Sequence, residues 1–461
     1  MGLLSKMNPT LRTIIICAVT FVVAAAVCIT ALIVSATVNP DTIINSIRHD
    51  AAKIEQRGDY PIVIGQTGTP KYRYDGFTDS LMLLQAIPDR SQSALDNAVL
   101  GPYYAIGDGT PGGDGTGGVS PTAALLELVD DPSIEQQRSY VLYWHGYVVP
   151  LRALLTIMSP TNIITLNCAL FALLAVLVFE AFRRTGGLTY ALAFLAALII
   201  TFSWITPLGF QFFTTYLIAF LATLVLSWML QSAKRLSLIV PFFLTVGLLT
   251  AFFDFLTTPL LTFLLPLSLY LLWRVTKARE RSITLTFSDS FRKIVSVGMS
   301  WLVGYAGFWA SKWLMTAIVY SAKYATDEFA YALSQRSGIQ DGASLQDRVI
   351  AIYNNLYQLF AAHPDGSIFM GEFFLIAFAV IAALAALWWL LVKKSNTSAQ
   401  QIKESLPMLL VAAGPYVWYF MVAQHSTFHS WFTWRLQTAS LLAVAFFILL
   451  SVNWSGLRKR T

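Results

Sequence analysis

The chain has 461 residues, of which 56% are hydrophobic and only 12% are charged, and its net charge is +6. So apolar a composition excludes an ordinary soluble globular protein and predicts an all-α membrane protein, a polytopic bundle of helices. The basic residues follow the membrane orientation described below, so nucleic acid is not expected as a partner.

Ten apolar runs are long enough to form membrane-spanning helices, which need about 20 residues each. They cover residues 13–36, 160–182, 188–205, 209–231, 236–253, 256–273, 294–318, 370–392, 406–424 and 436–453. If the amino terminus is cytoplasmic, the inner segments hold 18 of the 31 Lys and Arg residues and 4 of the 25 acidic ones, a net +14 against −8 outside. This asymmetry predicts that both termini are cytoplasmic, because short basic loops stay on the inner side.

The predicted spans divide the chain into five parts. Residues 1–36 hold the cytoplasmic end and the first transmembrane helix, residues 37–159 form a large outer loop with amphipathic and re-entrant helices, and residues 160–318 hold transmembrane helices two to seven. Residues 319–369 form a second outer loop with a surface helix, which we expect to pack on the membrane or on the first outer loop. Residues 370–461 hold transmembrane helices eight to ten and a basic cytoplasmic tail.

The first outer loop starts with apolar residues at helical spacing from Ile43 to Ile54, which predict one amphipathic helix along the lipid headgroups. Beyond it, Asp75 and Asp79 stand four residues apart. If a helix begins at Gly76, the two carboxylates lie on nearly the same face and form a candidate acid and base site. The competing interpretation is a capped amphipathic helix, with Asp75 as its N-cap and both carboxylates in water.

Two further segments complete this loop. Residues 107–118 are rich in glycine and predict a mobile loop that folds over a substrate, with a calcium-binding loop as the alternative. The segment 143–147, Tyr-Trp-His-Gly-Tyr, precedes an apolar stretch over 148–158 that is too short to cross a membrane. We expect a re-entrant or interfacial helix that carries Arg152 near the outer water boundary. The alternative is an ordinary aromatic belt from which Arg152 extends to water.

Two more groups of polar residues lie at the outer ends of spans. Asp254 stands alone among aromatic residues after the fifth span, where it is either functional or a cap for the next helix. The segment 424–435 holds His425 and His429, which would share a helical face, and Arg435, which opens the tenth span. Two histidines do not specify a zinc site, so this patch favours phosphate binding.

The polar residues suited to chemistry share one side of the predicted topology. That outer side holds Asp75, Asp79, Asp254, Arg152, Arg435 and all five histidines, at 49, 145, 363, 425 and 429. Each of these residues could be structural. Their gathering on one membrane face favours an active cavity that opens outward.

In this layout the chain resembles the GT-C glycosyltransferases, enzymes with many spans that use polyprenyl-phosphate sugars on the outer face. The resemblance covers the architecture of the whole chain, with a long first outer loop followed by a bundle of spans. The segments Y-W-H-G-Y at 143–147 and H-S-x-x-H-x-W-F-T-W-R at 425–435 are similar to those of bacterial membrane proteins grouped with that class. One departure is that no acidic doublet follows the first span, where Asp41 stands alone.

The resemblance implies a glycosyltransferase of the cell envelope, in the bacterial plasma membrane, that moves a sugar from a polyprenyl-phosphate donor to a glycan, lipid or protein acceptor. The donor phosphate would be bound by Arg435, His425, His429, Arg152 and His145, with Asp79 as base, Asp75 orienting it and Asp254 as the competing base. No cofactor is specified, and the sequence does not decide whether a divalent metal is required.

The alternatives are a transporter or flippase of lipid-linked or envelope precursors, for which broken helices and internal repeats would be expected, and a non-catalytic membrane scaffold.

Overall fold

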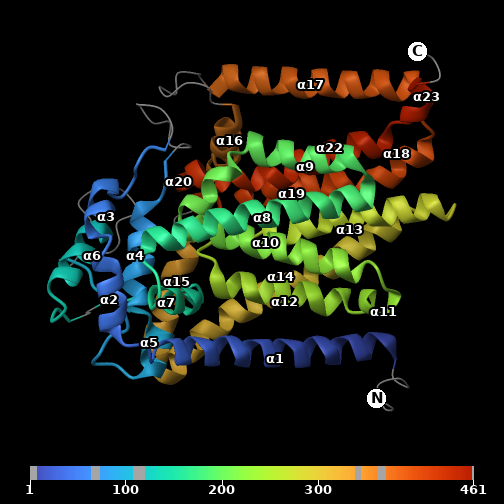
Figure 1. The fold of residues 1–461 in the computed structure, drawn as a ribbon. Coiled ribbons are helices and arrows are strands. Elements are labelled where there is room, and N and C mark those ends of the chain that lie inside the picture. The colour runs from blue at the N-terminus through green and yellow to red at the C-terminus, as the bar shows by residue number, and fades with distance from the viewer. Residues whose placement is uncertain are drawn as a thin grey trace.

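The computed structural model describes residues 8–63, 73–106, 120–135, 138–337, 344–360 and 370–458. Its long helices lie side by side in a bundle, and the short helices α2 to α7 gather at one end of that bundle (Figure 1). Both ends of the chain lie at the opposite end of the bundle (Figure 1). The group of short helices, residues 40–155, is called the cap below.

Six helical segments of the described chain are long and apolar enough to cross a membrane. They are α1 (Pro9–Ser35), α8 (Pro160–Gly186), α10 (Phe210–Met229), α14 (Phe287–Val319), most of α17 (Met370–Lys394), and the run of α21 (Ser430–Thr433), η4 (Trp434–Leu436) and α22 (Gln437–Ser451). The protein is therefore all-α, and its apolar helices are those of a multi-pass membrane protein.

The other four expected spans are also helices, but they are too short or too charged to count as candidate spans by length and composition. The helices α9 (Leu188–Ile200), α12 (Ile239–Phe253) and α19 (Pro407–Met421) have 13, 15 and 15 residues. At 1.5 Å per residue they cover about 20 to 23 Å of a hydrocarbon core of about 30 Å. The helix α13 (Leu261–Glu280) has 20 residues, but its last turns are charged. The count of ten spans therefore stays a prediction.

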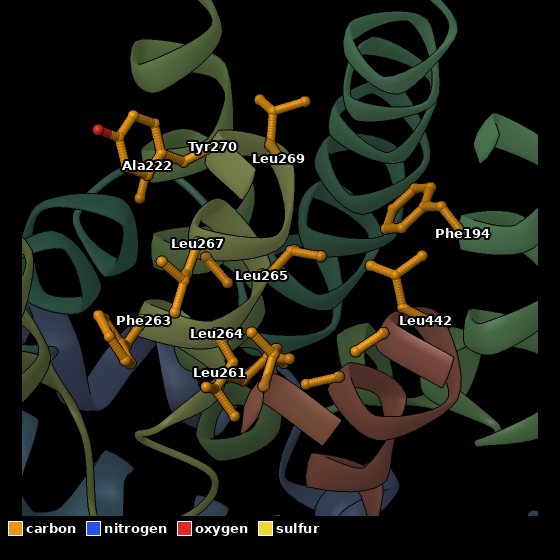
Figure 2. Packing of buried hydrophobic residues seen from close by; sticks show 14 of the residues in the cluster. Phe194, Ala222, Leu261, Phe263, Leu264, Leu265, Leu267, Leu269, Tyr270 and Leu442 are labelled. Atoms are coloured by element: carbon orange, nitrogen blue, oxygen red, sulfur yellow. The ribbon is translucent and has the colours of Figure 1, made fainter. Parts of the chain in front are cut away.

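The centre of the bundle is α13, whose side chains are buried on every face from Leu261 to Leu272. A helix that is apolar all round lies either in lipid or inside a protein core, and the burial of every face places this part of α13 in the core. Figure 2 shows this packing, in which Leu264 and Leu265 of α13 lie near Phe194 of α9 and Leu442 of α22. The shorter apolar helices thus belong to the same core as the long ones.

A second apolar core joins the cap to the bundle. It combines residues of α2, α4, α6 and α7 with residues of α1, α8, α12 and α14. The cap elements are α2 (Pro40–Arg48), α3 (Ala51–Arg57), α4 (Gly76–Ala86), α5 (Ala94–Leu100), β1 (Pro102–Tyr103), α6 (Pro121–Asp130), β2 (Arg138–Ser139) and α7 (Val148–Leu155). The strands β1 and β2 are antiparallel, with Pro102 opposite Ser139. The cap is therefore packed on the helices rather than tethered to them.

The remaining elements connect the bundle helices or close the chain. They are η3 (Ser203–Leu208), α11 (Ala233–Leu236), α15 (Ala322–Ser337), α16 (Leu345–Phe360), α18 (Ala399–Ser405), α20 (Ala423–Phe428) and α23 (Trp454–Arg458). The helix α16 lies where a surface helix was expected, within residues 319–369, but it packs mainly on α19, α20 and α21 rather than on the first loop. The Asn355 amide of α16 donates to the Ser426 carbonyl at 2.8 Å, so a buried polar contact fixes this placement.

Two expectations for the first outer loop are changed by the structure. The single helix expected over 43–54 is divided into α2 and α3, with His49 and Asp50 between them. The division lets the buried Asp50 carboxylate reach the first turn of α8, where it accepts from the Thr161 N–H at 2.8 Å. The apolar stretch 148–158 forms the eight-residue α7. The glycine-rich tract 107–118 and His363 lie outside the described residues.

Candidate functional site

Asp75 begins the helix that carries the candidate acid and base pair. The helix α4 starts at Gly76, and Asp75 is its N-cap. One carboxylate oxygen accepts from the Thr78 N–H at 2.9 Å, and the other from the Thr78 hydroxyl at 2.8 Å. The expectation that this cap lies in water is wrong, because Asp75 is only 4% exposed. Burial raises the pKa of the Asp75 carboxyl to about 7.

Asp79 lies one turn further along α4 and caps a different helix. Its carboxylate accepts from the Phe210 N–H at 3.0 Å and from the Gln211 N–H at 3.2 Å, both at the start of α10. The Tyr74 hydroxyl donates to the same carboxylate. Burial raises the pKa of Asp79 to about 6, although these hydrogen bonds and the charge of Arg57 act in the opposite direction. The opposing effects leave the pKa of this carboxyl closer to neutral pH than that of an exposed aspartate.

Gly209 allows this close approach of α4 to α10. A Cβ atom at position 209 would lie 2.6 Å from the Tyr74 ring and 3.3 Å from an Asp79 carboxylate oxygen. Gly209 also has no side chain with which to cap α10 itself. The N-terminus of α10, with its positive helix dipole, is thus satisfied by an aspartate from the cap.

The Asp79 carboxylate lies on the wall of a pocket between the cap and the bundle. The pocket is lined by Lys53, Ile54, Arg57 and Gly58 at α3, by Tyr74, Gly76, Asp79, Ser80 and Leu83 at α4, by Pro160, Thr161 and Ile164 of α8, and by Phe210 of α10. Apolar and polar side chains both contribute to this lining. Such a pocket suits a ligand that has a polar group joined to an apolar chain.

Asp254 contacts the same helix about one turn beyond Asp79. It follows the last residue of α12 and accepts from the Thr215 hydroxyl of α10 at 2.9 Å. It also accepts from the Thr257 N–H at 3.1 and 3.2 Å, so it stabilises the turn that leads to α13. The interpretation of Asp254 as a cap for the next helix is wrong, because α13 begins at Leu261 and has Leu260 as its N-cap. The Asp254 carboxylate closes the turn before that helix instead, and a functional role stays a prediction.

Arg435 and the two histidines lie on the other side of the α10 N-terminus. The Arg435 guanidinium carbon is 5.4 Å from the Phe212 ring centroid, and Arg435 is only 1% exposed. The rings of His425 and His429 have centroids 4.6 Å apart, so they share a face as expected. His425 Nε2 lies 2.9 Å from the Leu256 carbonyl oxygen, beside Asp254. The first turns of α10 therefore have Asp79, Asp254 and Arg435 around them.

Arg152 and His145 are placed elsewhere, at the C-terminal end of α4. Arg152 donates to the carbonyl oxygens of Ala86 at 3.0 Å and Gln85 at 3.1 Å, and to the Ser35 hydroxyl at 3.1 Å. His145 Nε2 lies 2.5 Å from the Tyr140 carbonyl oxygen. Burial, with the nearby Lys312 charge, lowers the pKa of His145 to about 3, so its ring is neutral. Neither residue lines the pocket beside Asp79.

The polar residues of the pocket that were not predicted from the sequence include Lys53, Arg57 and Tyr74. Lys53 and Arg57 are four apart on α3 and therefore share a face, a signal that the amphipathic pattern contained. Tyr74 stands directly before Asp75, but nothing local indicates that its hydroxyl reaches Asp79. The described part of the chain holds no group of three or more His, Cys, Asp or Glu side chains arranged to bind a metal.

The candidate site lies between the cap and the bundle. The pocket and the contacts around the start of α10 lie where the cap meets the bundle, at the end of the molecule opposite to both chain ends (Figure 1). Comparison of the chain with protein-family models, with curated proteins and with solved structures gives no match. The functional proposal therefore rests on the geometry of the site.

Proposed function

We propose that this protein is a membrane glycosyltransferase that moves a sugar from a polyprenyl-phosphate donor to an acceptor on the outer face of the bacterial plasma membrane. The observation that carries the proposal is the buried Asp79 carboxylate on the wall of a part-apolar pocket between cap and bundle. A lipid-linked donor needs such a place, because its chain stays in lipid while its sugar meets an acceptor from water.

The proposed orientation rests on charge and on the position of the chain ends. The segments that we assign to the cytoplasm carry a net +14, and the outer segments carry −8. The cap and both chain ends lie at opposite ends of the bundle, as an even number of crossings requires (Figure 1). The positive charge at the chain ends then favours a cap on the outer side.

The proposed reaction is a displacement at the anomeric carbon of the sugar. The acceptor hydroxyl oxygen forms a bond to that carbon, and the bond from that carbon to the phosphate oxygen breaks. Polyprenyl phosphate leaves with the electron pair, and the acceptor proton passes to the Asp79 carboxylate. Asp75, one turn away and also buried, orients Asp79 or the acceptor, and Asp254 is the competing base.

The test is a comparison of lipids that remain bound to the purified protein. Wild type, Asp79→Asn and Asp254→Asn would be isolated in mild detergent, and extracted lipids would be identified by mass spectrometry. We expect polyprenyl-phosphate species in wild type, and a higher share of the sugar-bearing form in Asp79→Asn, because that variant binds the donor without turnover. Bulk phospholipid alone in all three proteins would overturn the proposal.

One observation favours a second candidate, a non-catalytic membrane scaffold. Asp75, Asp79 and Asp254 each accept hydrogen bonds from backbone N–H groups, so each has a structural role without any reaction. In a scaffold these contacts would only fix the cap on the bundle. The lipid comparison separates the two candidates, because a scaffold has no reason to retain polyprenyl phosphate or to change its lipids in Asp79→Asn.

A further inference from the structure

The pocket beside Asp79 contains two cations from one short helix. The helix α3 places Lys53 and Arg57 four residues apart, so both side chains project from the same face. Both line the pocket, as do Tyr74 before α4 and Asp79 within it. Their positive charges therefore lie within the same pocket as the candidate base.

Lys53 and Arg57 make fewer contacts with protein groups than Arg152 and Arg435, which were expected to bind phosphate. Arg152 uses its guanidinium on three oxygens of the protein, and Arg435 is packed against the aromatic rings of Phe212 and Trp434. Arg57 is exposed and has neither a hydrogen bond nor an ion pair within the described residues. Lys53 forms one ion pair, with Asp50 at 2.8 Å, and its side chain is 55% exposed.

The N–H hydrogen-bond donors of Arg57 and Lys53 are suited to a phosphate group. A guanidinium offers several N–H groups in a planar fork, and an ammonium offers three donors, of which Lys53 uses one on Asp50. The Arg57 charge offsets the repulsion that an anion would meet from the Asp79 carboxylate. Lys53, whose charge is shared with Asp50, adds further N–H donors.

The apolar part of the pocket selects the kind of phosphate. Ile54, Leu83, Ile164 and Phe210 contribute to the lining, and two of these residues belong to the first turns of the apolar helices α8 and α10. A free phosphate ion would gain nothing from these side chains, whereas a lipid chain would bury apolar surface against them. The lining therefore fits a phosphate that is attached to a hydrocarbon chain.

We propose that Arg57 and Lys53 bind the phosphate of a lipid-linked phosphate ester in this pocket, beside Asp79. The assignment rests on the proposed function for the identity of the ligand as donor. It gives the phosphate-binding role to residues of α3 in place of Arg152 and His145, which lie at the other end of α4.

The experiment measures ligand binding to the full-length protein in nanodiscs of neutral phosphatidylcholine. The probe is farnesyl phosphate, with farnesol and inorganic phosphate as comparisons. The proteins are wild type, Arg57→Gln, Arg57→Lys, the double variant Arg57→Gln with Lys53→Gln, and Arg90→Gln. Arg90 is a matched control, because it is an exposed cap arginine that pairs with Asp41 and does not line the pocket.

We expect the wild type to bind farnesyl phosphate more tightly than farnesol or inorganic phosphate. Arg57→Gln should weaken that binding by about tenfold or more, since a charge-assisted contact is lost, and the double variant should weaken it further. Arg57→Lys should retain part of the affinity, and Arg90→Gln all of it. Farnesol should bind equally to all five proteins, which shows that the pocket remains folded.

Three outcomes would overturn the assignment or the identity of its ligand. Equal affinity of wild type and the double variant for farnesyl phosphate would exclude Arg57 and Lys53 while leaving the proposed function intact. If phosphatidylglycerol in the nanodiscs displaced farnesyl phosphate at equal concentration, the pocket would be a general phospholipid site and its ligand would not be the sugar donor. A wild type that binds farnesyl phosphate no better than farnesol would contradict both this assignment and the proposed function.

Discussion

Asp75 and Asp79 are both buried, yet their oxygens have different partners. The Asp79 oxygens accept from backbone N–H groups of Phe210 and Gln211, which can only donate. Asp75 binds one residue, Thr78, through its N–H and its hydroxyl, and the hydroxyl can donate or accept. An amide at position 75 can therefore keep both contacts, whereas an amide at position 79 places its NH₂ group where the Phe210 N–H and the Tyr74 hydroxyl now donate.

We expect Asp79→Asn to destabilise the protein by about 1 to 3 kcal/mol, because buried hydrogen bonds to a charged acceptor are replaced by weaker ones. The asparagine oxygen can still accept from the Phe210 and Gln211 N–H groups, but its NH₂ group would face the Tyr74 hydroxyl, which now donates to the carboxylate. The favourable interaction of a negative charge with the helix N-terminus would be lost as well. Thermal unfolding of the purified variant in detergent measures this effect, and an unchanged unfolding temperature would contradict the contact.

Asp75→Asn should show a different pattern, one that depends on pH. Burial raises the pKa of Asp75 to about 7, above its ordinary value of 3.8, so the folded state binds more protons between these values. The free energy of unfolding of the wild type therefore falls as pH rises from about 4 to about 7. The variant lacks this titration, so its stability relative to wild type should be greater at pH 8 than at pH 5. A difference that is the same at both pH values would exclude a buried, titrating Asp75.

The contacts between residues that are neighbours in the sequence could be predicted for this site. The contacts between residues far apart in the sequence could not. The helix start at Gly76 and the N-cap at Asp75 follow from residues next to each other. The partners of Asp79 lie 131 and 132 residues away, across the whole of α8 and α9. Nothing near Asp79 specifies that pairing, since any exposed helix N-terminus attracts a carboxylate.

At the scale of elements, buried charges of the cap lie at helix ends. Asp50 accepts from the first turn of α8, Asp79 from the first turn of α10, and Arg152 donates to the last carbonyls of α4. These signs match the helix dipole at each end. Arg152 was expected near the outer water boundary on a re-entrant or interfacial helix, or extending to water from an aromatic belt. The structure instead buries it, because α4 presents carbonyl oxygens that require a donor.

We expect Arg152→Ala to cost about 3 kcal/mol or more, because it leaves two buried carbonyl oxygens and the Ser35 hydroxyl without their donor. Arg90→Ala is the matched control, since its ion pair with Asp41 is exposed and such pairs contribute about 0 to 1 kcal/mol. Thermal unfolding of both variants measures the contrast. Equal losses in the two would show that Arg152 does not hold the end of α4.

At the scale of the whole molecule, composition and charge correctly predicted the all-α fold class, but they could not determine the number of membrane-spanning helices. A high content of apolar residues requires membrane helices, and all ten expected runs are helical in the structure. Crossing depends on how the helices tilt and surround one another, which composition does not contain. The helix α13 shows this, because its charged last turns make it a poor span by composition while its position is the most buried in the bundle.

The clearest test of the whole architecture is the side of the membrane at which each connection lies. We expect cysteines introduced at Glu135 in the cap and at Trp204 in η3 to react with an impermeant maleimide on intact cells. Cysteines at Thr189, in the first turn of α9, and Ala399, in α18, should react only after permeabilisation. The native Cys17, Cys28 and Cys168 would be replaced by alanine in all four proteins.

The positions at 189 and 204 decide whether the 13-residue α9 crosses the membrane. Its length of about 20 Å is less than a typical hydrocarbon core, so a crossing requires locally thin lipid or a core shielded by neighbouring helices. The burial of Phe194 and Leu198 against the bundle provides that shielding on one face. Labelling of both positions from the same side would show that α9 does not cross. The ten-span topology would then be wrong, and with it the charge difference between the two sides on which the outer placement of the cap depends.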